Sequence, residues 1–574
     1  MHGSHNIRVG ADVDHQTDFD KFADNDKRPY FVFANLLDFA QDKPYYQSGP
    51  TVDTTTGGTA YDYLMQRIFY LGPFIQDDWK VTPRLTLNLG FRYDYFGHLG
   101  SLKNNRVSIP KFAPGSGRTF AEQITNGGMK DYGNGYQVPN RVGGVAPRIG
   151  FGWDVLGDGR TALRGGYGIF YDRYGNEAYR TVTNPPRWVV PNVYSTAGPQ
   201  NFSYVVGPNF LPPPGFTVQI NPRGGIVGTS VAAQGVQPNI PPPTTHQWMV
   251  SLQHTVGHDL LLEGDYYGTH ASNLLMIADV NRFPGDLIVN KGVLTRLNPY
   301  FGSVNYSYDP GVSDSNYASL MVSKRYSRSW SLTGIFTLGK ATDDNSSFGT
   351  GARNSGNIVN SLNPASQHGL TDFSVGKRIS LDSTFIVPDP WKTGLKSKLL
   401  AGWRMEEIGI IQSGLPFSVY CSAPFKPVFQ VPGDSTTPVV ANQGCDYNAD
   451  GFAYDFPNQP DFGNHQSVGR SAFLRGLFTA SQFPAPPLGQ EGNLGRNTFS
   501  GPGLVNFNAE FAKATNIPWF THEGASFEFR ADIFNLLNRV NLGLPVSDMA
   551  SSLFGHSESQ QQPRTVQFGV YIKF

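Results

Sequence analysis

Hydrophobic and polar residues alternate without interruption along the last ten residues of the chain, TVQFGVYIKF. Val566, Phe568, Val570, Ile572 and Phe574 occupy one set of alternate positions, and mostly polar or small residues occupy the other. Because successive side chains of a β-strand point to opposite faces, this pattern predicts a strand with one apolar face. Such a strand suits the wall of a membrane β-barrel, although a half-buried strand of a soluble protein shows the same alternation.

The amino-terminal residues show the same pattern, since Ile7, Val9, Ala11 and Val13 alternate with polar residues or glycine. No basic segment followed by an apolar stretch and a cleavage site is found there, so we expect no secretory signal peptide in this stretch. We therefore expect the chain to begin inside a strand, with further strands of the same fold lying upstream of it.

Further strands are predicted as hairpins, in which two alternating segments flank a short turn. The charged residues within the segments favour one face, as a water-filled lumen would allow. The predicted lumen-facing set is Arg84, Arg92, Asp94, Glu528, Arg530 and Asp532. The predicted hairpins pair residues 74–81 with 84–95, 145–155 with 161–172, 245–255 with 259–269, 316–326 with 330–340, and 504–513 with 525–535.

The connections between hairpins are long and rich in Gly, Pro, Asn, Ser and Tyr. They cover residues 97–144, 172–243, 271–314, 341–376 and 421–502. Short turns on one side and long loops on the other are the asymmetry of outer-membrane barrels. We count about fifteen strands, the first and last running in the same direction, so the predicted antiparallel barrel is incomplete.

Composition narrows the class of protein further. The 45 basic and 45 acidic side chains balance, so no net charge favours nucleic acid as a partner. Aromatic residues make up 13% of the chain, and 65 Gly and 42 Pro supply many turns, which favours a large all-β protein. The mean hydropathy is -0.31, and no apolar run of about 18 residues occurs, so we expect no transmembrane helix.

Six segments together resemble the barrel of Oar-like TonB-dependent receptors, and they spread over residues 70 to 574. The segments are GPFIQDDWKVTPRLTLNLGFRYDY, VAPRIGFGWDVLGDGRTALRGGYGIFYD, THQWMVSLQHTVGHDLLLEGDYYGTH, GNLGRNTFSGPG, FRADIFNLLNRVN and TVQFGVYIKF. The resemblance implies an outer-membrane barrel of about 22 strands, filled by a plug domain, that imports a bulky ligand with energy from the TonB system.

The resemblance also implies which parts of such a receptor lie outside these 574 residues. They are the signal peptide, a carboxypeptidase-regulatory-like domain, the TonB box, the plug and the first barrel strands. The carboxy-terminal Phe574 resembles the signal that the barrel assembly machinery reads.

One predicted external loop, residues 446–451, has the sequence DYNADG. Asp446, Asn448 and Asp450 supply oxygen atoms at alternate positions, followed by a turn-forming glycine, as calcium loops do. Position twelve is a proline, so the segment is not an EF-hand, and Asp455 with a main-chain carbonyl would have to complete the coordination. A calcium site and an ion-free loop rich in Asn, Asp and Gly both fit this segment.

The two cysteines of the chain, Cys421 and Cys445, flank the segment that leads into this loop. In an exported protein a pair so placed predicts a disulfide. The histidines do not cluster, and no GxSxG, HExxH or Walker motif occurs, so we predict no catalytic site and no required cofactor.

The sequence therefore predicts an all-β protein of the cell outer membrane, with a single transmembrane antiparallel β-barrel domain across residues 1–574. The expected function is ligand binding by external loops for TonB-dependent uptake. The alternative is a structural or adhesive surface barrel without transport. The expected partners are outer-membrane lipid, the barrel assembly machinery, the TonB system acting through a plug, and a ligand that the sequence does not identify.

Overall fold

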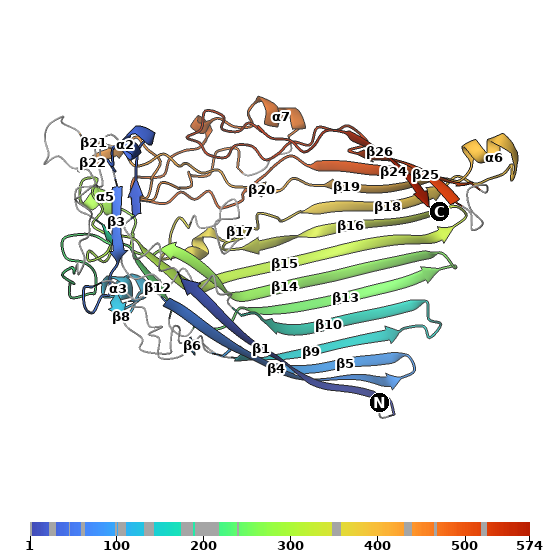
Figure 1. The fold of residues 1–574 in the computed structure, drawn as a ribbon, viewed down its shortest axis with the longest axis horizontal. Coiled ribbons are helices and arrows are strands. Elements are labelled where there is room, and N and C mark those ends of the chain that lie inside the picture. The colour runs from blue at the N-terminus through green and yellow to red at the C-terminus, as the bar shows by residue number, and fades with distance from the viewer. Residues whose placement is uncertain are drawn as a thin grey trace.

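The computed structural model is dominated by long β-strands (Figure 1). The described residues are 3–21, 30–44, 46–58, 63–97, 100–101, 111–130, 143–173, 187–189, 217–237, 240–346, 358–429, 439–463, 468–517 and 525–573. No helix within this part of the chain is long and apolar enough to cross a membrane.

One sheet contains nineteen of the described strands, of which five are short. The other fourteen strands are long, and each pairs antiparallel with its neighbours in chain order. The long strands are β1 (His5–Lys21), β4 (Tyr63–Thr82), β5 (Leu85–Tyr95), β9 (Gly143–Asp154), β10 (Thr161–Tyr171), β13 (Thr244–Val256), β14 (Leu260–Asp279), β15 (Val304–Ser327), β16 (Trp330–Asp343), β18 (Lys377–Ile386), β19 (Trp403–Gln412), β24 (Leu504–Ile517), β25 (Ala525–Phe534) and β26 (Thr565–Lys573).

The remaining elements are short and belong mostly to the connections. The strands are β2 (Tyr30–Val32), β3 (Tyr46–Thr51), β6 (Gly100–Ser101), β7 (Lys111–Ala113), β8 (Gly128–Lys130), β11 (Arg187–Val189), β12 (Ala233–Val236), β17 (Gly369–Leu370), β20 (Pro416–Phe417), β21 (Pro427–Phe429), β22 (Val439–Asn442) and β23 (Phe499–Ser500). The helices are α2 (Leu36–Ala40), α3 (Phe120–Thr125), α5 (Asp286–Val289), α6 (Gly394–Leu400), α7 (Arg470–Arg475), η2 (Pro364–Gln367) and η3 (Ala480–Gln482).

The long sheet is open, because β1 pairs with β4 and β26 pairs with β25, and no pairing of described residues joins β1 to β26. The predicted incompleteness is thus confirmed, but the argument from strand direction is wrong. His5 of β1 lies opposite Trp79, so β1 begins beside the short turn that follows β4 and runs opposite to β26. The segment between β1 and β4 places β2 and β3 in a separate sheet with β11, rather than adding a strand to the wall.

The predicted asymmetry of the connections is confirmed. Both ends of the chain in Figure 1 lie at the end of the sheet where the turns are short, such as residues 83–84, 257–259 and 328–329. The turn at residues 155–160 is built as expected, since Gly157 and Gly159 have positive φ angles. The Asp154 carboxylate accepts hydrogen bonds from the main-chain N–H groups of both glycines, at 2.8 and 3.0 Å.

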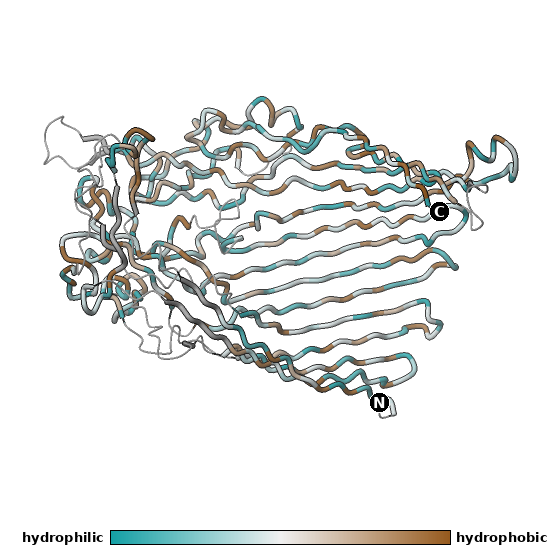
Figure 2. The backbone as a smooth tube through the Cα atoms, in the orientation of Figure 1, coloured by the Kyte–Doolittle hydropathy of each residue, from teal (hydrophilic) through white to brown (hydrophobic). Residues whose placement is uncertain are grey.

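The two faces of the sheet differ in polarity, and hydrophobic and hydrophilic residues alternate along the long strands (Figure 2). Directly paired residues share a face, so the register defines each row across the wall. One row runs through Ile7, Asp77, Leu89, Ile149, Tyr167 and Trp248. The opposite face carries Arg8, Gln76, Gly90, Arg148, Gly168, Gln247, Thr269 and Ser315. The first face therefore presents mainly apolar side chains and the second mainly polar ones.

Four tryptophans lie on the apolar face close to the short-turn ends of their strands. Trp79, Trp153, Trp330 and Trp403 lie on β4, β9, β16 and β19, within a few residues of the turns. The Lys324 ammonium group lies 4.2 Å from the centroid of the Trp330 ring. Tryptophan rings gather at the level where apolar protein surface meets the membrane–water interface. These four residues, here called the tryptophan belt, mark that level at the short-turn end.

At the other end the long connections fold against one another. Strands β14 and β15 extend further than predicted, so that the loop between them covers only residues 280–303. Two buried apolar clusters form around the connections. The first contains Phe112, Ile124, Met276, Phe301, Tyr306 and Ile358, and the second contains Phe417, Tyr454, Phe456, Phe478, Phe499 and Phe554, among others. The loops therefore form a folded cap with its own core.

Candidate functional site

Charged side chains form a cluster on the polar face near the first strands. The Arg92 guanidinium contacts the Asp94 carboxylate and the Asp12 carboxylate, each at 2.7 Å, and it also donates to the Tyr70 hydroxyl. The Tyr70 hydroxyl in turn donates to Asp94 at 2.7 Å. Strands β1, β4 and β5 are thus joined through one arginine on the face predicted to line the lumen.

A second charged cluster lies on the polar face of the last strands. The Arg404 guanidinium lies 2.7 Å from Glu510, and Arg530 lies 3.1 Å from the other carboxylate oxygen of Glu510. Glu528 approaches Arg404 and Arg530 to 3.8 and 3.7 Å. Asp532 pairs with Glu510 in the register and therefore shares this face. Charges of both signs alternate here, which limits repulsion between neighbouring carboxylates.

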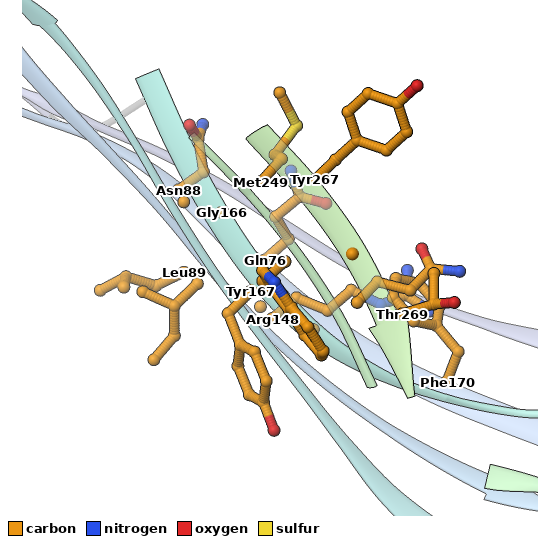
Figure 3. A pocket seen from close by; sticks show the side chains of 17 residues that line it. Gln76, Asn88, Leu89, Arg148, Gly166, Tyr167, Phe170, Met249, Tyr267 and Thr269 are labelled. Carbon is orange, nitrogen blue, oxygen red and sulfur yellow. The ribbon is translucent and has the colours of Figure 1, made fainter. Parts of the chain in front are cut away.

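Between the two clusters the wall carries a hollow of about 510 Å³. Its lining includes Gly90, Gly150, Gly166 and Gly168, which project no side chains, and the side chain of Arg148 (Figure 3). The Arg148 guanidinium lies 4.5 Å from the centroid of the Phe170 ring, on the same polar face. The hollow thus combines a floor of glycine main chain with a cationic group and aromatic surface.

The DYNADG loop lies in the cap, and the structure gathers its four predicted oxygen donors into one buried segment. Both carboxylate oxygens of Asp446 accept main-chain N–H groups, from residues 450 and 451, at 3.1 and 3.0 Å. Asp455 accepts the N–H of Asn448 at 2.9 Å, and its second oxygen has no hydrogen-bond partner. Asp450 forms a buried ion pair with Arg282, at 2.9 Å. The loop is therefore folded around its own acidic side chains.

The electrostatics of the loop follow from this burial. Burial raises the pKa of Asp455 to about 8 and that of Asp450 to about 6, and for Asp450 the positive charge of Arg282 opposes the shift. Burial also raises the pKa of Asp446, against the effect of its main-chain hydrogen bonds. Among the described residues no three His, Cys, Asp or Glu side chains are arranged to hold a metal ion. Calcium binding by this loop stays a prediction.

The remaining predicted residues lie in different places. Cys421 and Cys445 are joined by a disulfide in the structure, with their Cα atoms 5.5 Å apart. Arg84 lies in the turn between β4 and β5, beside Gly157, and not within a strand wall. Its main-chain carbonyl still accepts the N–H of Asp154, at 2.8 Å, so it lies at the strand end and its assignment to the lumen stays a prediction. Phe574 lies outside the described residues.

Two buried arginines of the cap were not predicted as functional residues. Arg282 lies 168 residues from its partner Asp450 in the sequence. Its guanidinium also lies 4.3 Å from the centroid of the Phe452 ring, and Phe452 is similarly remote in sequence. Arg496 belongs to the segment GNLGRNTFSGPG, but its partner Asp343 is 153 residues away. Only the glycine-rich setting of Arg496 was visible in the sequence, and nothing there identified either partner.

The family assignment follows from a comparison of the whole chain with known protein families. Residues 1–567 match the family described as outer membrane beta barrel domain. The chain belongs to this family. The outer-membrane barrel assignment makes the apolar face with its tryptophan belt the lipid-facing side and the polar face the lumen side. It also places the protein in the outer membrane. No curated protein sequence matches the chain.

Solved structures similar to this outer-membrane barrel include three transporters or receptors. The outer membrane transporter YddB from Escherichia coli has 10% identity and a TM-score of 0.48, with 99% of this chain and 51% of that chain covered. The siderophore receptor PiuA from Acinetobacter baumannii has 10% identity and a TM-score of 0.41, covering 99% and 53%. The FrpB iron transporter from Neisseria meningitidis has 11% identity and a TM-score of 0.42, covering 100% and 53%. The chain spans about half the length of these proteins, and similarity this low assigns it neither a ligand nor a mechanism.

Proposed function

We propose that this chain is the barrel of an Oar-like TonB-dependent receptor, which binds a ligand at its external loops and imports it through a plugged lumen. The observation that supports the proposal most directly is the cap, in which long loops from many strands share two buried apolar clusters at one end of a polar wall. A folded cap can present a defined binding surface, because loops positioned by a rigid scaffold commonly carry binding residues.

The lumen face supports passage of a ligand or contact with a plug. The clusters around Arg92 and around Arg404 and Arg530 expose charges of both signs to the lumen, and the hollow at Arg148 lies between them. A polar inner wall is common to outer-membrane barrels, so it is the hollow that favours passage of a ligand over a purely adhesive role. In this proposal the wall contacts a plug from an upstream part of the protein, the TonB system acts through that plug, and the barrel assembly machinery inserts the chain. The proposal includes no catalytic step.

The proposal is tested by uptake into cells that express the full-length gene product. Accumulation of labelled ferric siderophores, cobalamin and oligosaccharides is measured in otherwise identical strains with and without TonB. We expect accumulation of one ligand class that disappears without TonB, and the variant Arg148→Ala should reduce it while leaving the amount of assembled barrel unchanged. Arg470→Ala in α7 is the matched control, because Arg470 is exposed and α7 lies apart from the strands that line the hollow (Figure 1). Surface attachment without any TonB-dependent uptake would favour the adhesive alternative.

A further inference from the structure

The connection between β18 and β19 departs from the rule for its end of the barrel. The other described connections at the short-turn end contain only a few residues, whereas this one covers residues 387–402 and contains α6. Figure 1 shows α6 projecting beyond the strands at that end. We call residues 387–402 the α6 arm.

The α6 arm exposes large apolar side chains and carries basic ones between them. Leu395 is 72% exposed, Leu399 57% and Trp391 42%. No residue of α6 is buried, so the helix does not pack these side chains against the barrel. Residues 395 and 399 are four positions apart and therefore lie on the same side of the helix. The arm has three lysines, at positions 392, 396 and 398, and a single acidic residue, Asp389. Exposed leucine and tryptophan combined with lysine is the composition of helices that lie in a membrane interface.

Two side chains of the lipid-facing surface fix the position of the arm. The Trp403 indole donates a hydrogen bond to the carbonyl oxygen of Leu399 at 2.8 Å, and the Lys513 ammonium group donates to that of Ala401. Trp403 and Lys513 are register partners, and Lys513 also pairs with Phe529, whose ring packs against Trp403. The carboxy-terminal end of α6 is therefore held on the lipid-facing side of the barrel.

Trp403 also connects the arm to the tryptophan belt. Trp403 belongs to the belt, so the arm begins at the level of the interface and continues the apolar surface of the wall. This continuity, together with the excess of lysine over acidic residues, favours a lipid surface with anionic headgroups as the partner. A protein partner beneath the lumen would instead require the arm to be held on the polar face.

We propose that the α6 arm lies in the inner leaflet of the outer membrane, with Leu395 and Leu399 at the boundary of the acyl chains and the three lysines at anionic phospholipid headgroups. The arm then acts as an interfacial anchor beside the last third of the barrel. The proposal rests on the family assignment and does not depend on transport, because an adhesive barrel would carry the same anchor.

Nitroxide accessibility tests the position of the arm. The full-length gene product is purified and reconstituted in vesicles of phosphatidylethanolamine with a minority of phosphatidylglycerol, and a spin label is attached at Leu395→Cys or, separately, Leu399→Cys. The control is Asp158→Cys, an exposed turn residue at the same end of the barrel. We expect labels 395 and 399 to collide more often with oxygen than with a water-soluble nickel complex, and label 158 to show the opposite preference.

Headgroup charge provides an independent readout. Reversal of the three lysines to glutamate should shift label 395 towards the nickel complex in these vesicles, and the heat-modifiable migration of the barrel should be unchanged. If label 395 is as accessible to nickel as label 158 in the wild-type background, the proposal is wrong. A label that is protected only when periplasmic proteins are added would also overturn it, because that result identifies a protein partner.

Discussion

The buried guanidinium of Arg496 offers a measurable test of how the cap is held together. Its side chain is 2% exposed and forms an ion pair with Asp343 at the end of β16. It also donates to the carbonyl oxygen of Gln367 and to the hydroxyl of Ser346, each at 3.1 Å. One side chain therefore links the β19–β24 connection to the β16–β18 connection.

Replacement of Arg496 by methionine keeps much of the apolar stem but leaves the Asp343 carboxylate buried without this partner. Removing one member of a buried ion pair typically costs about 3–5 kcal/mol. Since every 1.4 kcal/mol corresponds to about a tenfold change in an equilibrium constant, local opening of this part of the cap should become roughly 10² to 4 × 10³ times more frequent. Arg496→Lys should be intermediate, because an ammonium group cannot reproduce the planar fork of donors.

Amide hydrogen exchange of the reconstituted protein, read by mass spectrometry, measures this opening directly. Peptides covering residues 494–500 should lose protection in Arg496→Met, whereas peptides from β13 and β14 should not change. Arg470→Met is the matched control, because Arg470 is exposed and donates to a carbonyl oxygen, at 3.0 Å. The double variant Arg496→Met with Asp343→Asn should recover part of the lost protection. A change of less than tenfold in Arg496→Met, or an equal change in the control, would refute the assigned role.

Four further predictions concern other parts of the molecule. Unreduced mass spectrometry of exported protein should find one linked pair, Cys421 with Cys445, and two alkylatable thiols would contradict this. Millimolar calcium should increase protease protection of the DYNADG loop, as expected for extracellular sites of about 10⁻⁴ to 10⁻³ M affinity. A digest that calcium does not change would contradict the ion site. Burial lowers the pKa of Lys111 to about 7, so the charged form opposes folding and cap stability should decrease as the pH falls from 10.5 towards 7. Lys111→Met should abolish that pH dependence of the thermal midpoint, and a retained dependence would assign it to another group. Deletion of Phe574 from the full-length protein should lower the amount of assembled barrel in membrane fractions, and unchanged assembly would exclude that role.

The strands were predictable because alternation is written into neighbouring residues. The apolar positions of β26 and the charged positions Glu528 and Arg530 of β25 follow from a period of two, which needs no knowledge of the rest of the fold. Alternation does not state which strand lies alongside, however. The predicted direction of β1 was therefore wrong, and only its register with β4 shows which way it runs.

The cap was much less predictable, for a physical reason. Its stability comes from contacts between loops that are distant in sequence, such as Arg282 with Asp450, and no local period records such a contact. The α6 arm was missed as well, because its helix is too short to show a repeating apolar face. By contrast, the DYNADG hexapeptide was noticed because its spacing is itself local, although the sequence did not show that its carboxylates are buried.

The agreement between strand order and chain order has a consequence for how such a protein can change over generations. An insertion in any one long connection lengthens a single hairpin, and doubling the length of a flexible loop adds only about 0.6 kcal/mol of closure entropy. The wall alone would therefore tolerate the exchange of loops one at a time. The cap does not, since β12 lies against both β7 and β15 and Arg282 reaches across to another loop. Recombination that respects these contacts has to move the external loops as one block, and grafting a single loop from a relative should unfold its neighbours.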